Sequence, residues 1–446
     1  MKNSFRTLIS GAVIVASMVA VASLAMANAS AHASTKARFL APAPMRIQSG
    51  LDSGNLAVPA MQIDTASKPR VKYTTSQACK PARKGRVSCL AVRRTAYVNG
   101  VRQHGVLPAT GTAFGAPALR KAYGITTLGA RYKVIAVVDA MHSGTAFEDL
   151  AGYRNLYQLG AMENCGVSNA SPTKLPNGKN PCFLQLDQTG KVNNSSQTTD
   201  VGWAQEIALD IEMASAVCPH CSVLLVEANS PSFADLDAAV RTAANFAGVL
   251  AISNSYGGPD IAEYQNSAFA YATGNGIAVT ASSGDSGYGV SAPASFASVI
   301  GVGGTRLTAY TNGSWAQETA WAKGGSGCSK LNPRAEWQGS KTGCPGKSVV
   351  DVAAVADPAT GVTVFYSGEW YTFGGTSAAS PIVAALFALK GNFAGDAGGF
   401  LSKNAAQLHD ITDGSNGTCP TLIWCNAAPG FDGPTGLGTP AGTAAF

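Results

Sequence analysis

The chain has 446 residues, of which 46% are hydrophobic and 13% charged, and its formal net charge of +6 hides two oppositely charged regions. Residues 1–110 hold 15 Lys or Arg and 2 Asp or Glu, whereas the remainder holds 17 basic and 24 acidic residues. Few aromatic residues accompany the basic region, and no stretch after residue 33 is long and apolar enough to span a membrane, so we expect neither a nucleic-acid partner nor a membrane-embedded protein.

Residues 1–33 have the pattern of a signal peptide. Lys2 and Arg6 precede a mostly apolar run from Leu8 to Ala27, and small residues at 25–27 or 31–33 offer cleavage sites. An uncleaved N-terminal anchor is the alternative, which the alanines and serines in the run disfavour. We therefore expect a secreted, extracellular protein that is free of the membrane after signal cleavage.

Residues 34–112 carry most of the positive charge and are interpreted as a basic pro-segment or linker. A stretch such as Arg83-Lys84-Gly85-Arg86 is also compatible with nucleic-acid binding, but a pro-segment is the preferred interpretation. Whether this piece inhibits the protein, aids its folding or only links two parts stays open at the level of sequence.

From residue 113 to residue 446 the alternation of apolar strands and helical stretches predicts one large α/β domain, with a parallel sheet and helices on both faces. The segment from Asn164 to Ser196 is rich in Asn, Gly and Pro and is interpreted as a surface insertion. The predicted strands are Val134–Asp139, Val223–Glu227, Val249–Asn254, Ile277–Ala281 and Val299–Val302, and the predicted helices are Trp203–Val217, Phe233–Phe246 and Tyr264–Asn275.

The predicted helix from Trp203 carries Glu206 and Asp210 four residues apart, which stacks the two carboxyl groups on one face. Two carboxyl groups held together away from water share one proton, and the singly protonated pair can act as a base in acid. A solvated acidic helix face is the alternative, and the apolar neighbours on the same face argue against it. These neighbours are Trp203, Met213, Ala214 and Val217.

An apolar strand from Val279 leads into Ser-Gly-Asp-Ser-Gly, which places Asp285 between two glycines. Taken alone, this segment is most simply a turn. Its sequence context makes the segment more informative, because polar and glycine-rich motifs also follow the predicted strands that come before and after it in the chain.

Gly-Thr-Ser-Ala-Ala-Ser-Pro at 375–381 sets Ser377 between a glycine turn and the apolar stretch Ile382–Leu389. Ser377 is then expected at the start of a buried helix, where unpaired amides and the helix dipole favour a developing oxyanion. A helix cap is the alternative reading of the same residues. A nucleophilic serine usually needs a histidine base, yet none of the five histidines is well placed: His32, His104, His142, His220 and His409.

The order of these motifs resembles the sedolisin family of serine-carboxyl peptidases over roughly residues 117–446. The resemblance implies a subtilisin-like α/β fold with Ser377 as nucleophile, Glu206 as general base and acid, Asp210 as its orienting partner and Asp285 as a protonated oxyanion donor. The motifs are Glu-x-x-x-Asp at 206–210, Ser-Asn-Ser-Tyr-Gly at 253–257, Ser-Gly-Asp-Ser-Gly at 283–287, Pro-Ala-Ser at 293–295, Val-Gly-Gly-Thr at 302–305 and Gly-Thr-Ser-x-x-x-Pro at 375–381.

The same resemblance implies one bound Ca²⁺ ion near the C-terminus, at Asp410-Ile411 and Pro429-Gly430-Phe431-Asp432. Carboxylate and carbonyl oxygens are the ligands that calcium prefers. Ala428 stands where the family commonly has glycine. The implied ligands are the carboxylates of Asp410 and Asp432 and the carbonyls of Ile411, Ala428 and Gly430.

The ten cysteines fall into five pairs of close neighbours, which in an exported chain suggests local disulfides. A zinc or redox motif is the rival interpretation of Cys218-Pro-His-Cys221, and it lacks a second cluster of ligands. The five pairs are the cysteines at positions 79 and 89, 165 and 182, 218 and 221, 328 and 344, and 419 and 425.

The sequence therefore predicts a monomeric, acid-active endopeptidase whose partners are protein or peptide substrates. Two alternatives stay open: a catalytically idle binding protein with the same fold, and a hydrolase that uses Asp139 with a histidine. Sedolisins usually carry a longer folded prodomain, so the short segment 34–112 departs from the family pattern.

Overall fold

The computed structural model describes residues 70–103, 113–167, 170–192, 198–391, 393 and 395–446. The predicted signal peptide and most of the basic segment, residues 34–69 and 104–112, lie outside the described residues. All of the described residues belong to one unit of the chain, Ser67–Phe446.

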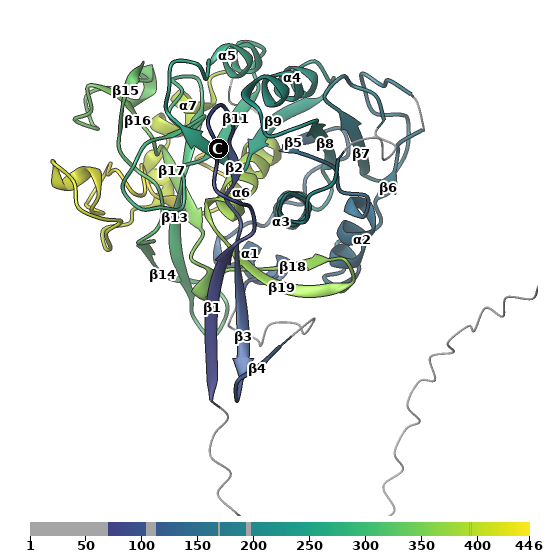
Figure 1. The fold of residues 1–446 in the computed structure, drawn as a ribbon, viewed down its shortest axis with the longest axis horizontal. Helices are drawn as coiled ribbons and strands as arrows, with labels where there is room; N and C mark the ends of the chain where they lie inside the picture. The colour runs from purple at the N-terminus through teal and green to yellow at the C-terminus, as the bar shows by residue number, and fades with distance from the viewer. Residues whose placement is uncertain (1–69, 104–112, 168–169, 193–197, 392, 394) are drawn as a thin grey trace, which may run out of the picture. The chain divides into compact units, whose positions relative to one another are not determined.

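A nine-stranded, mainly parallel sheet forms the centre of this unit (Figure 1). Its middle strand, β5 (Val134–Ala140), is buried on both faces: Ile135 and Val137 join one hydrophobic cluster, whereas Val134 and Ala136 join another. Only the β13–β14 pair is antiparallel among the described pairs of this sheet. The spatial order is β14 (Trp315–Ala320), β13 (Ile300–Ala309), β11 (Ala278–Ser282), β9 (Val249–Asn254), β5, β8 (Ser222–Ala228), β7 (Cys182–Asp187) and β6 (Glu163–Asn164), and β17 (Val352–Val355) also pairs with β13.

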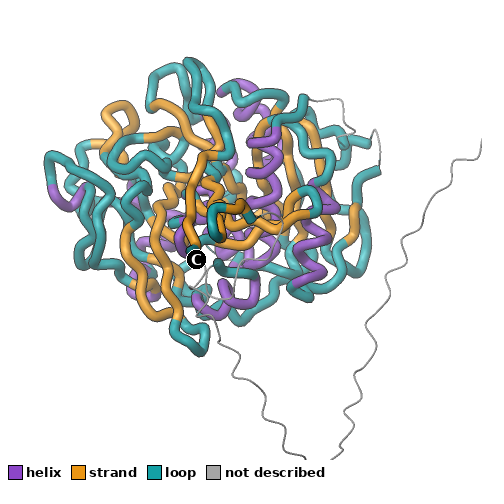
Figure 2. The backbone as a smooth tube through the Cα atoms, turned by 60° about the horizontal axis from the view of Figure 1, so that its bottom comes forward, coloured by secondary structure: helices purple, strands orange, loops and turns teal. Residues whose placement is uncertain are grey.

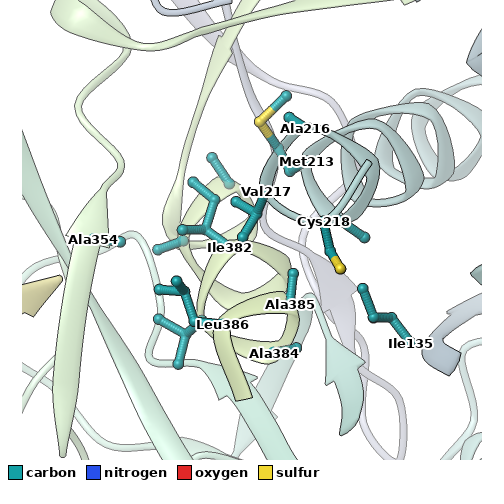
Figure 3. Close-up of a cluster of buried hydrophobic side chains, with 14 of the residues drawn as sticks. Ile135, Met213, Ala216, Val217, Cys218, Ala354, Ile382, Ala384, Ala385 and Leu386 are labelled. Atoms are coloured by element: carbon teal, nitrogen blue, oxygen red, sulfur yellow. The ribbon is translucent and has the colours of Figure 1, made fainter. Parts of the chain in front are cut away.

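Helices cover both faces of the sheet (Figures 1 and 2). On one face α3 packs against α6, where Met213 and Val217 approach Ile382 and Leu386 (Figure 3). On the other face α4 and α5 pack against each other and the sheet. The helices are α1 (Ala116–Ala122), α2 (Ala146–Leu156), α3 (Val201–Val217), α6 (Thr376–Lys390) and α7 (Ala397–Lys403) in the first cluster, and α4 (Phe233–Ala244) and α5 (Ser267–Gly274) in the second.

The predicted parallel sheet with helices on both faces is confirmed, but the interpretation of residues 164–196 as a surface insertion is wrong in part. Residues 182–187 of this segment form β7, which lies in the central sheet between β8 and β6. The short apolar run Cys-Phe-Leu-Gln-Leu that forms the strand is buried, although Asn, Gly and Pro surround it in the sequence.

Residues 70–102, which the sequence assigned to the basic segment, pair with strands of the predicted catalytic domain. The long strands β1 and β3 lie side by side, and β3 continues into a sheet with β19 (Figure 1). The interpretation of residues 34–112 as a pro-segment or linker stays a prediction. The sheet that includes β3 and β19 consists of β1 (Val71–Gln77), β3 (Val92–Val98), β4 (Val101–Arg102), β19 (Glu369–Gly374) and β18 (Val362–Tyr366). A second small sheet consists of β2 (Ser88–Cys89), β10 (Tyr256–Pro259) and β12 (Ser291–Ala292).

The remaining elements are short and surround the central sheet. They are β15 (Cys328–Pro333) with β16 (Gly346–Ser348), β20 (Leu408–His409) with β21 (Thr439–Pro440), and the 3₁₀ turns η1 (Glu336–Gln338), η2 (Pro358–Thr360), η3 (Ala405–Gln407) and η4 (Leu422–Trp424).

The predicted local pairing of cysteines is confirmed. Disulfides join Cys79 to Cys89, Cys165 to Cys182, Cys218 to Cys221, Cys328 to Cys344 and Cys419 to Cys425. Within the described ranges, every helix is too short or too polar to cross a lipid bilayer.

Candidate active site

The strand β19 ends in a glycine turn that delivers Ser377 to the start of α6. Gly375 has φ +93°, a conformation that glycine adopts readily, and Ser377 is the second residue of the helix. The Ser377 side chain is fully buried. Its Oγ donates to the carbonyl oxygen of Ser255 at 3.2 Å, and the Ser377 side chain lowers the pKa of the Glu206 carboxyl group, whose Oε1 makes no hydrogen bond within the described residues.

Glu206 and Asp210 project from α3, one helical turn apart, and neither side chain is exposed. The helix begins at Asp200, whose carboxylate accepts the backbone N–H groups of Gly202 and Trp203. Every residue of α3 from position 202 onward is buried, which rules out a solvated acidic face. The two carboxyl groups therefore lie in the protein interior beside Ser377.

Burial raises the pKa of Glu206 well above its usual range, and the charge of Asp139 raises it further. Hydrogen bonds from Ser377 and from the backbone N–H of Ala91 oppose this rise. For Asp210 burial is again the main cause of a raised pKa, followed by the charges of Asp139 and Glu206. Because charges this close repel, the carboxyl groups share protons rather than ionise together.

Asp139 is a member of this cluster that the sequence did not place with Glu206 and Asp210. It lies near the end of β5, fully buried, directly across the ladder from Glu227 of β8. Its pKa is raised well above the usual range by burial and then by the charge of Glu227. The sequence does show that Asp139 ends an apolar strand. It does not show which helix packs over that strand, so it could not place Asp139 beside Glu206 and Asp210.

The described histidines lie away from the serine, which counts against the alternative of a histidine base. His142 bonds Glu227 through Nδ1 at 2.8 Å, and His409 stacks on the ring of Trp315 with 4.0 Å between centroids. His220 is exposed in the turn between α3 and β8. Glu206, by contrast, lies on α3, which packs against α6, and the Ser377 side chain lowers the pKa of its carboxyl group.

Asp285 lies in the loop after β11 and reaches the N-terminus of α6. Its Oδ1 accepts the backbone N–H of Thr376 at 2.8 Å and the Thr376 hydroxyl at 2.9 Å, which turns Oδ2 toward Gly375. Burial raises the pKa of Asp285 to about 7, against the opposing effect of the bonds from Thr376 and from the Gln77 side chain. When protonated, Asp285 can therefore donate a hydrogen bond through Oδ2 beside Gly375, two residues before Ser377. Thr376 and Gln77 are neighbours that sequence reasoning missed.

Asp410 and Asp432 converge on the loop that joins them. Asp410 Oδ2 accepts the N–H of Gly430 at 2.9 Å, and Asp432 Oδ2 accepts the N–H of Ala428 at 3.0 Å. Burial raises the pKa of Asp432 to about 7, and the charge of Asp410 adds to this rise. Ile411 is buried next to Asp410. Carboxylate oxygens such as these two are among the ligands that a hard cation such as calcium prefers.

Residues 188–397 match the family described as the subtilase family. Kumamolisin of Bacillus sp. (strain MN-32) is 35% identical over 274 residues, which are 53% of this chain and 49% of kumamolisin. Sedolisin of Pseudomonas sp. (strain 101) is 32% identical over 204 residues, 38% of this chain and 34% of sedolisin. The chain thus spans half or less of the length of these relatives.

Solved structures show the same fold. Pseudomonas sedolisin, a serine-carboxyl proteinase in complex with two molecules of pseudo-iodotyrostatin, superposes with a TM-score of 0.62 at 23% identity, covering 75% of this chain and 96% of that chain. The S41 psychrophilic protease gives a TM-score of 0.51 at 19% identity, covering 74% of this chain. At these identities the likeness bears on the fold, a mainly parallel sheet between two layers of helices.

Proposed function

We propose that this chain, which is similar to kumamolisin and sedolisin and has a subtilisin-like fold, is a member of the sedolisin family of serine-carboxyl peptidases. It would be a secreted endopeptidase that hydrolyses peptide bonds of proteins at acidic pH. The observation that carries the proposal is the packing of α3, which buries Glu206 and Asp210 one turn apart, against α6, which buries Ser377 at its N-terminus. Five disulfides within the described residues support an oxidising, extracellular setting.

In the first step Ser377 Oγ attacks the carbonyl carbon of the substrate while Glu206 takes the hydroxyl proton. Glu206 then gives a proton to the leaving nitrogen, so that the C–N bond breaks and an acyl ester remains on Ser377. Asp210 orients Glu206 and shares its proton, because the two buried groups repel as anions. Water hydrolyses the ester with Glu206 again as the base.

The negative charge that develops on the carbonyl oxygen needs a hydrogen-bond donor. Asp285 supplies one only while it is protonated, and its pKa of about 7 keeps it protonated in acid. The N-terminus of α6 adds the positive end of a helix dipole at the same point. The acid requirement therefore follows from Asp285.

A calcium ion at the C-terminal loop completes the proposal. The carboxylates of Asp410 and Asp432 and the carbonyls of Ile411, Ala428 and Gly430 would hold it. The residues fit the ion, because Asp410 and Asp432 both bond the backbone of residues 428–430 and so bring two carboxylates to one short loop. Bound calcium would tie the loop to the strand pair β20–β21 and stabilise the domain, without a part in the chemistry.

The test of the proposed activity is casein cleavage measured from strongly acidic to alkaline pH, with wild-type protein and Ser377→Ala. We expect an acid optimum in wild type and no cleavage by the variant, which should keep the wild-type circular dichroism spectrum. An alkaline optimum would favour a histidine base, and hydrolysis by folded Ser377→Ala would remove Ser377 from the mechanism.

A further inference from the structure

An extended part of the N-terminal segment crosses the candidate active site. Its strand β2 pairs antiparallel with β10, so that Cys89 lies opposite Tyr256 and Ser88 opposite Gly257. The next residue, Leu90, donates its backbone N–H to the carbonyl oxygen of Ser255 at 3.3 Å. Backbone pairing with a strand edge is how an extended peptide is held independently of its sequence.

The peptide bond between Leu90 and Ala91 lies among the catalytic groups. The N–H of Ala91 donates to Glu206 Oε2 at 2.8 Å. On the other side of the bond, the Leu90 carbonyl oxygen lies so close to Gly375 that an added Cβ there would overlap it, and the same Cβ would lie 2.8 Å from Asp285 Oδ2. The carbonyl oxygen and the nitrogen of one peptide bond therefore face the two groups that a scissile bond needs.

Ser255 links this peptide bond to the nucleophile. Its carbonyl oxygen accepts from both the Leu90 N–H and the Ser377 hydroxyl. The Leu90 side chain is half-buried, and one of its methyl carbons would lie 3.1 Å from a Cβ placed on Gly257. Leu90 thus occupies the position of the residue whose carbonyl is attacked, with its side chain against β10.

Both sides of the Leu90–Ala91 bond are anchored independently. On the acyl side, a disulfide joins Cys89 to Cys79, and the Val87 N–H donates to the Pro231 carbonyl at 3.0 Å. On the amine side, Ala91 is followed by β3, which pairs along its length with β1 and through Val92–Arg94 with β19. The Ala78 N–H also donates to the Ala91 carbonyl at 2.9 Å, which closes the loop.

We propose that residues 78–92 form an internal inhibitor that binds its own active site as a substrate does, with Leu90–Ala91 as the reactive peptide bond. The inference rests on the proposed peptidase function. Attack of Ser377 on the Leu90 carbonyl carbon forms an ester, and the C–N bond breaks as the serine proton passes through Glu206 to the Ala91 nitrogen. Water then releases Ser377 and leaves a Leu90 carboxyl group and an Ala91 amine.

The anchors explain why this cleavage does not free the site. After the bond is cut, the new carboxyl group stays attached through the disulfide and β1, and the new amine stays attached through β3. The amine therefore remains at high effective concentration and can re-form the bond, while external peptides must compete with a tethered segment. A tethered ligand has an effective concentration in the millimolar range, so even a loop of roughly 0.1 mM intrinsic affinity leaves about one site in ten free.

The decisive experiment compares two variants that each lack one local disulfide. Cys79→Ser/Cys89→Ser loosens the proposed inhibitor, whereas Cys419→Ser/Cys425→Ser removes a disulfide that lies outside the segment. The measurement is kcat/KM for an internally quenched peptide at acidic pH, calculated per mole of folded protein, and labelling of Ser377 by a covalent serine reagent is recorded beside it. We expect about a tenfold rise for the first variant and wild-type values for the second.

A second pair covers the case in which the disulfide variant does not fold. Leu90→Lys places a charge against β10. Val101→Lys places the same charge at an exposed position of β4, outside residues 78–92. Activation by Leu90→Lys alone supports the inhibitor. Equal kcat/KM in wild type and all folded variants overturns the proposed inhibitor and leaves the proposed peptidase function standing. Absence of both hydrolysis and Ser377 labelling in every protein overturns the peptidase function itself.

Two further measurements identify the reactive bond. Intact-mass analysis after incubation in acid should find a cut between Leu90 and Ala91 in wild type and none in Ser377→Ala, with both pieces eluting together in gel filtration. A cut at another bond of the segment would contradict the assignment of Leu90–Ala91. A synthetic disulfide-closed peptide of residues 78–92 should inhibit the Cys79→Ser/Cys89→Ser variant, and the same peptide with Leu90→Lys should not.

Discussion

Three buried carboxyl groups, those of Glu206, Asp210 and Asp139, form one cluster, in which burial raises the pKa values and neighbouring acidic charges raise them further. Such a cluster must keep some of its protons, because ionising a second neighbour in a dry interior costs more than ionising the first. When the cluster has lost only its first proton, the carboxylate it then holds can act as a base at a pH where a histidine would already be protonated. The residue types and their burial thus set the working pH together.

Replacing Glu206 or Asp210 by the neutral amide should abolish most of the activity. Glu206→Gln removes the group that accepts and returns the proton, and Asp210→Asn removes its ionisable partner, so each should lower kcat by about 10²–10⁴-fold. Steady-state kinetics with a peptide substrate measure the loss. His142→Gln is the matched control and should retain most of the wild-type kcat, since His142 bonds Glu227 rather than Ser377; the reverse pattern would show that the base is misassigned.

The alkaline limit of activity should follow Asp285. Its pKa of about 7 is raised by burial, so the protonated donor is fully present in acid and is lost as the pH rises through about 7. Asp285→Asn keeps an N–H donor at every pH, so its kcat/KM profile should fall less steeply above pH 7 than that of wild type. Asp285→Ala, which has no donor at all, should be slow at every pH; turnover equal to wild type would exclude Asp285 from the site.

Among the elements, α3 and α6 carry the reactive groups. Both helices are buried almost throughout and pack against each other. A helix packed on all sides cannot turn its polar residues to solvent, so Glu206 and Asp210 are held where the fold puts them. The position of α3 is fixed at its start by the Asp200 cap.

Removal of this cap should cost stability without touching a catalytic group. Asp200→Ala leaves the N–H groups of Gly202 and Trp203 without their acceptor, at a cost of about 1 kcal/mol. For a protein of this size, with an unfolding entropy of about 2.1 cal/mol/K per residue, that corresponds to a fall of roughly 1–2 °C in the thermal midpoint. Calorimetry checks it against Asp200→Asn, which keeps an acceptor; identical midpoints in the two variants would mean that the cap contributes nothing.

The central sheet and the two helices could be predicted from the sequence because each is a continuous local pattern, such as the apolar run of β5 or the buried stretch of α6. Ser377, Glu206, Asp210 and Asp285 stand in local motifs of the same kind. The pairing of β2 with β10 could not be predicted in this way. It joins two very short strands more than 160 residues apart, and nothing in the residues Ser88 and Cys89 specifies a partner.

For the whole molecule, the C-terminal loop and the N-terminal strands add connections between distant parts of the chain. The loop with Asp410 and Asp432 closes beside the strand pair β20–β21, and the five disulfides each close a local loop. The proposed calcium ion would add a further connection at a point where two acidic groups repel.

Calcium removal should lower the thermal midpoint, and the loss should grow with pH. Without the ion, Asp432 has a raised pKa of about 7, so its contribution to stability is present when it is protonated and is lost as the pH rises through that value. Calcium at a hundredfold excess over its dissociation constant would restore about 2.7 kcal/mol. The measurement is calorimetry with calcium and with chelator at two pH values.

Asp432→Ala serves as the control for this experiment and should make the midpoint independent of calcium. Asp413→Ala, at an exposed position of the same region, should leave the calcium effect unchanged. A wild-type midpoint that ignores the chelator at both pH values would contradict the calcium site.

The pairing of β3 with β19 has one more consequence. A protein expressed from residue 113 onward would lack the partners of Thr372–Gly374 and of Tyr256–Gly257, so two bare strand edges would flank the nucleophile. Bare edges are templates for pairing with other chains. The N-terminal strands therefore also protect the protein from self-association, and an expression trial of the shortened chain should recover it mainly as aggregate.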